Sequence, residues 1–200
     1  SGLLSQNPGE KHIAGQLKTA LAEAREKNWA NAMLEEWIAS ALHVSKHIRN
    51  ETESLLNKLE IEDQCIDLLE HQKIANFAKS TLMVLGSGQM GRGVVERWLL
   101  RTSQSRVLWG YRRHSPEVPE EWTNRVETGT FDELKPRLNQ VDALVCAAAC
   151  DRPLLDVSDI EFFAKDRTTP IVDLGVLRNV SLSLSPTPPG INITAPETLQ

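Results

Sequence analysis

The fold predicted by this sequence depends on one stretch, Thr81-Leu-Met-Val-Leu-Gly-Ser-Gly-Gln-Met-Gly-Arg-Gly93. Its apolar residues 82–85 favour a β-strand, and they lead directly into the pattern Gly86-x-Gly88-x-x-Gly91. The residues after the pattern predict an amphipathic helix, whose apolar face is formed by Val94, Val95, Trp98 and Leu99. A strand, a glycine turn and a helix in this order are the context in which the pattern G-x-G-x-x-G indicates dinucleotide binding.

Glycine is needed at each of these three positions for a different physical reason. Gly86 allows the sharp turn, Gly88 lets the backbone approach a pyrophosphate, and Gly91 lets the helix pack closely on the strand. The free amides and the dipole at the start of the helix favour an anionic ligand. The alternative is a glycine-rich turn that binds nothing. The strand and helix patterns on its two sides favour dinucleotide binding.

The second expected strand, 106–111, ends in residues that discriminate between nicotinamide cofactors. NAD sites place an acidic residue at this position to hold the ribose hydroxyls, whereas NADP sites favour arginine on the 2′-phosphate. The sequence continues with Arg112 and Arg113, and no acid occurs before Glu117. A guanidinium binds a phosphate with two hydrogen bonds, and a carboxylate repels it. We therefore predict NADPH as the cofactor, the alternative being two ordinary surface arginines.

The rest of the chain alternates between helical and strand patterns. Helices are predicted over 13–25, 31–47, 62–71, the stretch from the glycine turn to 101, 131–138 and 160–164. Further strands are predicted over 59–61, 141–149, 170–174 and 191–193, and loops over 114–121 and 185–190. This alternation predicts an α/β fold, a Rossmann-like doubly wound parallel sheet preceded by a helical segment.

Composition excludes several classes of protein. Hydrophobic residues make up 40% and charged residues 24% of the 200 positions, which is ordinary for a globular protein. A net charge of −5 argues against a generally basic nucleic-acid-binding surface, although a local basic patch stays open. No apolar run reaches membrane-spanning length, and the first residues lack the pattern of a signal peptide. We therefore predict a cytoplasmic protein without membrane segments.

The cysteines and histidines predict neither a metal site nor a catalytic group. Cys65, Cys146 and Cys150 contain no C-x-x-C pair and are expected to be reduced thiols, with Cys146 packed in the core. The histidines considered as catalytic candidates are expected to be surface or helix-end residues, namely His12, His43 and His47.

Several motifs, in one order along the chain, resemble those of glutamyl-tRNA reductase. Ser1-Gly-Leu-Leu-Ser5, Gly9-Glu10 and Ile13-Ala-Gly-Gln-Leu-Lys18 are similar to the family's S-G-L-D-S, G-E and I-L-G-Q-V-K. Lys46–Thr52 is similar to G-K-R-V-R-T-E-T, Gly86–Gly91 to G-x-G-E-M-G, and Tyr111-Arg112-Arg113 to N-R-T. Asp142–Leu155 is similar to D-x-V-I-S-A-T-G-A followed by P-x-I, and Asp173–Asn179 to D-x-A-V-P-R-D. Several motifs in a fixed order are far more specific than any one of them.

The resemblance implies an enzyme that uses NADPH to reduce glutamyl-tRNA to glutamate-1-semialdehyde, the first step of tetrapyrrole and heme biosynthesis. It implies that residues 1–52 are the C-terminal helical part of the catalytic domain and residues 53–200 the NADPH-binding domain. The family's catalytic cysteine and histidine lie upstream of the matching part, so the chain is expected to be a fragment without catalytic residues. By residue-wise carry-over, glutamate would be recognised by Ser5, Glu10 and Gln16. NADPH would be held by Gly86, Ser87, Gly88, Gln89, Met90, Gly91, Arg112 and Arg113.

The resemblance also implies partners: glutamyl-tRNA through the parent enzyme, a homodimer formed by a missing C-terminal domain, and the downstream aminomutase. The sequence departs from the family motifs at Leu4, at Gln89, at Cys146-Ala147-Ala148 and at Leu177, where the family has Asp, Glu, S-A-T and Pro. These departures leave one alternative open, a non-catalytic NADP-binding or regulatory relative. Another alternative is an NADP oxidoreductase of shikimate-dehydrogenase type, which does not account for the motifs in 1–20 and 46–52.

Overall fold

The computed structural model describes residues 12–51, 60–72, 74–175, 177–181 and 191–194. The chain divides into two compact units, Ser1–Ile61 and Glu62–Gln200, which are described one after the other.

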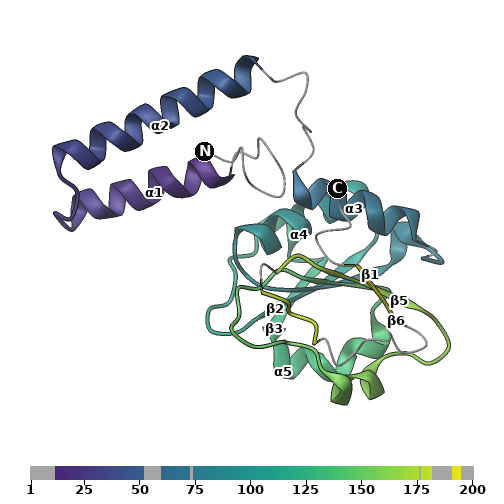
Figure 1. Ribbon diagram of the computed structural model, residues 1–200. Coiled ribbons are helices and arrows are strands. Elements are labelled where there is room, and N and C mark those ends of the chain that lie inside the picture. The colour runs from purple at the N-terminus through teal and green to yellow at the C-terminus, as the bar shows by residue number, and fades with distance from the viewer. Residues whose placement is uncertain (1–11, 52–59, 73, 176, 182–190, 195–200) are drawn as a thin grey trace. The chain divides into compact units, whose positions relative to one another are not determined.

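The first unit is a helical hairpin of α1 (His12–Glu26) and α2 (Ala32–Glu51) (Figure 1). Asn28 adopts a φ of 54° in the connecting turn, a left-handed conformation that asparagine tolerates. The Asn31 side chain accepts a hydrogen bond from the Leu34 amide at 2.9 Å, and so stabilises the start of α2. Both helices were predicted, and α2 extends four residues beyond the expected end at 47.

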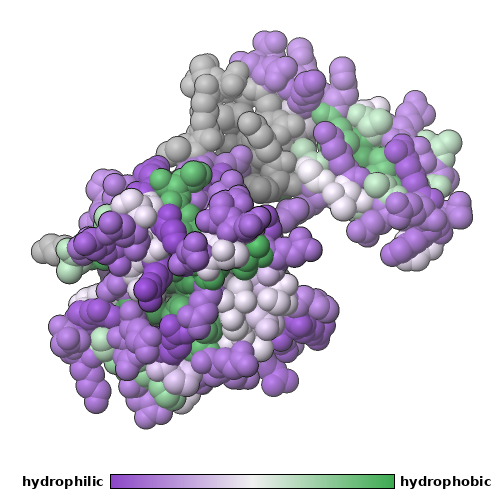
Figure 2. Space-filling view, turned by 180° about the vertical axis from the view of Figure 1, so that it is seen from behind, coloured by the Kyte–Doolittle hydropathy of each residue, from purple (hydrophilic) through white to green (hydrophobic). Residues whose placement is uncertain are grey.

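Several large apolar side chains of α2 and of the turn before it are exposed. Trp29, Met33, Trp37 and Val44 are 73%, 62%, 68% and 53% exposed. Figure 2 shows apolar residues at the surface of the hairpin, among hydrophilic ones. In contrast, Ala14, Leu21 and Ser45 are buried within the hairpin.

The second unit contains a six-stranded sheet with the order β3-β2-β1-β4-β5-β6, and every pair of neighbouring strands is parallel. The strands are β1 (Thr81–Leu85), β2 (Arg106–Tyr111), β3 (Val126–Thr130), β4 (Ala143–Cys146), β5 (Thr169–Asp173) and β6 (Ile191–Thr194). This sheet confirms the predicted Rossmann-like fold. The strand order reverses direction at β1, because the chain first builds outward through β2 and β3 and then returns to place β4 on the other side.

Helices cover both faces of the sheet (Figure 1). On one face lie α3 (Ile61–His71) and α4 (Gln89–Arg101); on the other lies α5 (Phe131–Leu134). The 3₁₀ helices are η1 (Phe77–Lys79), η2 (Glu120–Trp122), η3 (Lys135–Gln140) and η4 (Val157–Phe162). Residues 82–85 of β1 are all buried, as expected for a strand with helices on both sides.

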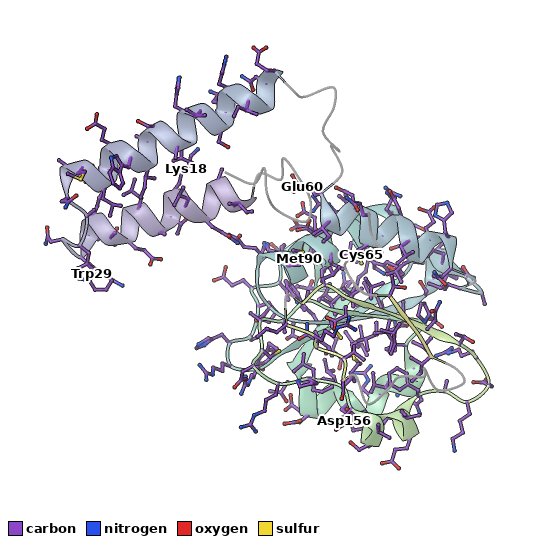
Figure 3. The ribbon with its side chains drawn as sticks, viewed as in Figure 1. Lys18, Trp29, Glu60, Cys65, Met90 and Asp156 are labelled. Carbon is purple, nitrogen blue, oxygen red and sulfur yellow. The ribbon has the colours of Figure 1, made fainter. Side chains whose placement is uncertain are left out.

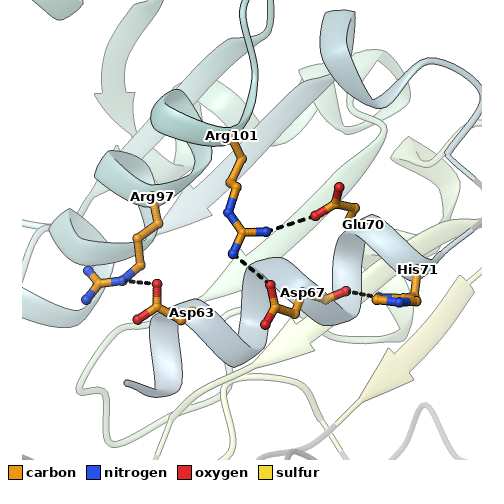
Figure 4. A network of polar contacts seen from close by, with 6 residues as sticks. All are labelled: Asp63, Asp67, Glu70, His71, Arg97 and Arg101. Atoms are coloured by element: carbon orange, nitrogen blue, oxygen red, sulfur yellow. Dashed lines mark hydrogen bonds and ion pairs between the residues drawn. The ribbon is translucent and has the colours of Figure 1, made fainter. Parts of the chain in front are cut away.

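The contact between α3 and α4 combines buried apolar residues with ion pairs at its edge (Figure 4). Arg97 pairs with Asp63 at 2.8 Å, and Arg101 pairs with Asp67 and Glu70 at 2.9 Å each. Beneath them, α3 buries Cys65, Ile66 and Leu69 completely; Figure 3 shows Cys65 on this helix. Burial raises the pKa of the Cys65 thiol, and the nearby Glu62 carboxylate raises it further, so Cys65 is a protonated core residue.

Two of the expected elements were assigned wrongly. The strand expected at 59–61 is wrong because Ile61 begins α3, where Glu62 and Asp63 in the first turn interact favourably with the helix dipole; Leu59 lies outside the described residues. The helix expected at 160–164 is instead η4, which begins at Val157. It begins there because Asp156 and Asp159 form a capping box, and Figure 3 labels Asp156 at this point.

Other differences concern the extent of elements. The strand expected at 141–149 is β4 and ends at Cys146, and the helix expected at 131–138 is divided into α5 and η3, which has Pro136 in its first turn. Strand β3 was not predicted. Among the described strands it lies at the edge of the sheet beside β2, and it contains Gly129, so its sequence lacks the apolar run of a central strand.

Candidate dinucleotide site

The turn between β1 and α4 requires glycine at its first position. Gly86 has a φ of +131°, and a Cβ atom there would lie 2.5 Å from the Ala147 carbonyl oxygen and 2.8 Å from the Ala148 nitrogen. The Gly86 amide donates to the Gly110 carbonyl at 2.9 Å, and the indole Nε1 of Trp109 donates to the Gly86 carbonyl at 2.9 Å. Strand β2 therefore holds the turn by two hydrogen bonds, and the backbone that follows β4 packs closely against it.

The other two glycines of the turn have opposite surroundings. A Cβ atom on Gly91 would overlap the Gly86 carbonyl, so only glycine lets α4 start this close to the strand. A Cβ atom on Gly88 would meet nothing within 4 Å, so the space in front of this residue is open. This is the arrangement that a backbone needs if a pyrophosphate is to approach it.

The start of α4 is suited to an anion. Gly88 is the N-cap residue, no side chain caps the helix, and the first turn contains no acidic residue. The amides of the first turn therefore point toward the open space without a competing carboxylate. Ser87, Gly88 and Gln89 are exposed, and Met90, labelled in Figure 3, is half-buried at the same end of α4.

Arg112 and Arg113 follow β2 directly, and both are exposed. Arg112 Nη1 lies 3.5 Å from Asp151 Oδ1, which belongs to the segment after β4, and the two side chains are 65% and 74% exposed. Such an exposed pair contributes little and leaves the guanidinium available to a stronger anion. The Ser87 hydroxyl donates to the His114 carbonyl at 3.2 Å and thereby links the glycine turn to the arginine loop.

The segment after β4 carries Cys150, which is 8% exposed and donates its S–H to Asn179 Oδ1 at 3.1 Å. Burial raises the pKa of the Cys150 thiol, Arg112 lowers it by a smaller amount, and Asp151 and Asp173 raise it, with a net increase. Cys146 is completely buried, and burial and Asp173 raise its pKa well above the ordinary value. Neither thiol has the lowered pKa of a nucleophilic cysteine.

The structure brings together one of the two predicted groups of site residues. The turn residues 86–91 and the two arginines lie at the carboxyl ends of β1 and β2, next to the reversal of strand order. The predicted glutamate-recognition group is different: Ser5 and Glu10 lie outside the described residues, and Gln16 is exposed on α1 in the other unit. Its role stays a prediction.

The sequence placed Asp173 and Asn179 at the two ends of one family motif, but it did not identify them as a buried hydrogen-bonded pair beside this site. Asp173 is the last residue of β5 and is 3% exposed, and Asn179 is completely buried. A charged residue at the end of an otherwise apolar strand, followed by glycine two residues later, was the available signal. Within the described residues, no cluster of three or more His, Cys, Asp or Glu side chains has the arrangement of a metal site.

These features define an α/β protein with a dinucleotide-type glycine turn at the reversal point of its sheet. Residues 68–191 match the family model described as Shikimate / quinate 5-dehydrogenase, and since they make up more than half of the chain, the chain belongs to that family. Residues 1–52 match a second model, Glutamyl-tRNAGlu reductase, N-terminal domain. The two models in this order confirm the resemblance to glutamyl-tRNA reductase that the motifs predicted.

Individual relatives agree with this assignment. The chain is 24% identical over 189 residues to glutamyl-tRNA reductase 2 of Flavobacterium johnsoniae, covering 94% of this chain and 42% of that protein. It is 27% identical over 177 residues to glutamyl-tRNA reductase of Methanopyrus kandleri, covering 88% of this chain and 43% of that protein. The chain thus spans about two fifths of the length of the curated relatives it matches.

A solved structure of glutamyl-tRNA reductase from Methanopyrus kandleri matches 99% of this chain and 50% of that chain, with a TM-score of 0.57 and 24% identity. At this identity the structural likeness supports the fold alone. None of the helices in the described residues combines the length and apolar character needed to cross a membrane.

Proposed function

We propose that the second unit binds NADPH and belongs to an NADPH-dependent glutamyl-tRNA reductase. The observation that carries this proposal is the open glycine turn between β1 and α4 together with two exposed arginines, Arg112 and Arg113, directly after β2. The family models over 1–52 and 68–191 support the choice of reaction.

The residues fit the cofactor in three respects. The open space in front of Gly88 and the uncapped start of α4 suit the pyrophosphate. Arg112 and Arg113 suit the 2′-phosphate, because a guanidinium offers a planar pair of donors to phosphate oxygens. No carboxylate lies within residues 112–116 to repel that phosphate or to hold a free 2′-hydroxyl instead.

In the proposed reaction, glutamyl-tRNA is reduced to glutamate-1-semialdehyde, the first step of tetrapyrrole biosynthesis. NADPH would supply the hydride that reduces a thioester carbon. The residues of the second unit would bind the phosphates and orient the nicotinamide, so that their contribution is position and electrostatics. The thiolate that forms the thioester would come from another part of the parent protein. The three cysteines of this chain do not suit that role, because Cys65, Cys146 and Cys150 are buried and their pKa values are raised.

The remaining parts of the proposal concern the parent protein. Residues 1–52 would be the C-terminal helical part of its catalytic domain, with Ser5, Glu10 and Gln16 in the glutamate pocket, and residues 53–200 would be its NADPH domain. The parent would act on glutamyl-tRNA in the cytoplasm, dimerise through a C-terminal domain and pass its product to the downstream aminomutase.

A second candidate is a non-catalytic NADP-binding or regulatory relative. It is favoured by the sequence Cys146-Ala147-Ala148 at the end of β4, which places no side-chain hydroxyl where the family motif has Ser and Thr. A third candidate, an oxidoreductase of shikimate-dehydrogenase type, accounts for the match over 68–191 but not for the match over 1–52.

Cofactor titration tests the proposal. The chain is titrated with NADPH and with NADH, and binding is followed by the fluorescence of the reduced nicotinamide. We expect tighter binding of NADPH, by about 10-fold or more, because only its 2′-phosphate gains hydrogen bonds from a guanidinium. Equal affinities or a preference for NADH would contradict the role of the arginines. Reduction of glutamyl-tRNA by the parent protein separates the first two candidates, because a non-catalytic relative would form no semialdehyde.

A further inference from the structure

Asn179 connects the segment after β4 to the segment after β5. Its Oδ1 accepts the S–H of Cys150 at 3.1 Å, and its backbone carbonyl accepts the amides of Leu154 at 2.7 Å and Leu155 at 3.1 Å. All three donors belong to the segment that follows β4. Asn179 is completely buried, so these bonds are protected from water.

Asn179 is itself held by Asp173 at the end of β5. Its amide donates to Asp173 Oδ2 at 2.8 Å, and its side-chain Nδ2 donates to Asp173 Oδ1 at 3.0 Å. The amides of Gly175 and Val180 donate to the same carboxylate at 3.0 Å each, which gives it four hydrogen bonds. A buried carboxylate with all of these donors is a rigid anchor, because losing any of them leaves charge unsatisfied.

The segment held by Asn179, residues 147–155, begins beside the glycine turn. The Ala147 amide donates to the Leu85 carbonyl at 2.7 Å, and the backbone of Ala147 and Ala148 is the part that a Cβ atom on Gly86 would strike. In this fold a dinucleotide lies across the carboxyl ends of the strands at the reversal point, with its adenosine half toward β2. Residues 147–155 follow β4 on the other side of β1 and therefore line the half of the crevice where the nicotinamide would lie. One exposed side chain of this segment, Asp151, reaches back to Arg112 on the adenosine side at 3.5 Å.

We propose that Asn179 is a positioning residue that fixes residues 147–155 as the nicotinamide side of the cofactor site, without touching the cofactor itself. This inference rests on the proposed binding of NADPH. The carboxylate of Asp173 orients Asn179, and Asn179 holds the segment at its middle through Cys150 and at its end through Leu154 and Leu155. When residues 147–155 are already ordered, less conformational entropy is lost on cofactor binding.

The test compares two ligands on Asn179→Ala by titration calorimetry. NADPH probes the whole site, and 2′-phospho-ADP-ribose probes the adenosine half without nicotinamide. The wild-type chain is measured first: if it binds neither ligand, the proposed function fails, independently of the role of Asn179. Asn179→Ala removes the side-chain bonds to Cys150 and Asp173 and keeps the backbone carbonyl that accepts from Leu154 and Leu155. For this variant we expect NADPH affinity to fall by about 10-fold or more, whereas affinity for 2′-phospho-ADP-ribose changes by less than about twofold. Equal losses for both ligands, or no loss for either, would overturn the positioning role.

Two further variants complete the test. Asn192→Ala is a control for the loss of an asparagine away from the site, because Asn192 is exposed, donates to Gln72 Oε1 at 3.3 Å and pairs with Pro170 near the amino end of β5. Both affinities are expected to stay unchanged in this variant. If Asn179→Ala does not fold, Cys150→Ala gives the same comparison, since it removes only the S–H bond to Asn179. We expect a loss of about threefold for NADPH and none for 2′-phospho-ADP-ribose. A loss shared by both ligands, or absent from both, would contradict the proposal.

Discussion

Replacing Gly88 with valine separates cofactor binding from folding. Gly88 has a φ of −76° and a ψ of −177°, an extended conformation that valine adopts, and a Cβ atom meets nothing within 4 Å. We therefore expect the free energy of unfolding to change by less than about 1 kcal/mol. The valine side chain would fill the space needed by the pyrophosphate, so NADPH affinity should fall at least about 100-fold, which is about 2.7 kcal/mol.

Gly86→Ala is the matched control for this prediction. At Gly86 a Cβ atom would lie 2.5 Å from the Ala147 carbonyl oxygen, and the φ of +131° is strained for alanine. This variant should lose about 2 kcal/mol or more of unfolding free energy. Both variants are measured by urea denaturation followed by circular dichroism and by NADPH fluorescence titration. A folded Gly88→Val variant that binds NADPH normally would refute the reasoning and leave the glycine turn with a structural role only.

Further variants test the arginines, the α3–α4 contact and the thiols. Arg112→Ala combined with Arg113→Ala should weaken NADPH binding by about 10-fold or more and leave NADH binding unchanged; a similar loss for both cofactors in fluorescence titration would contradict this. Arg101→Ala should cost less than about 1 kcal/mol in urea denaturation because its ion pairs are exposed, whereas Leu69→Ala should cost about 2–5 kcal/mol because Leu69 is completely buried. The reverse order would be inconsistent with the packing described. The chain alone should bind NADPH yet form no semialdehyde from glutamyl-tRNA; activity that is lost in Cys150→Ser would show that the nucleophile is Cys150. Because its pKa is raised, the Cys150 thiolate fraction at a given pH is lower than for a free cysteine, so alkylation by iodoacetamide should become fast only at higher pH; ordinary reactivity at pH 8 would argue against the burial of the thiol.

The parts of the fold that depend on local sequence were predictable. The strand 81–85, the glycine turn and the helix to Arg101 follow each other without interruption, and each has a pattern that neighbouring residues suffice to define. The same holds for the helices α1 and α2, because their apolar periodicity extends over enough residues to predict a helix.

The parts that depend on tertiary contact were not predictable in the same way. Strand β3 exists because it pairs with β2 at an edge of the sheet, and its own residues, Val-Glu-Thr-Gly-Thr, have little apolar character. The role of Asn179 depends on a thiol 29 positions earlier and on a carboxylate six positions earlier. No periodicity predicts such a contact. The available hints were a charged residue at the end of an apolar strand and the motif match over Asp173–Asn179, and neither indicates which side chains meet.

The same distinction between local sequence and tertiary contact applies to the predicted site residues. The glycine turn could be assigned from the sequence because the conformational requirement at Gly86 and the close approach at Gly91 are properties of the local backbone. The pairing of Arg112 with Asp151 could not, since it joins the ends of two strands that lie on opposite sides of β1.

A crystal structure of the chain with NADPH tests the central claim most directly. We predict the pyrophosphate at the glycine turn, within hydrogen-bonding distance of the first amides of α4, and the 2′-phosphate on Arg112 and Arg113 with the Asp151 contact broken. NADPH bound elsewhere, or with its 2′-phosphate away from both arginines, would contradict the account.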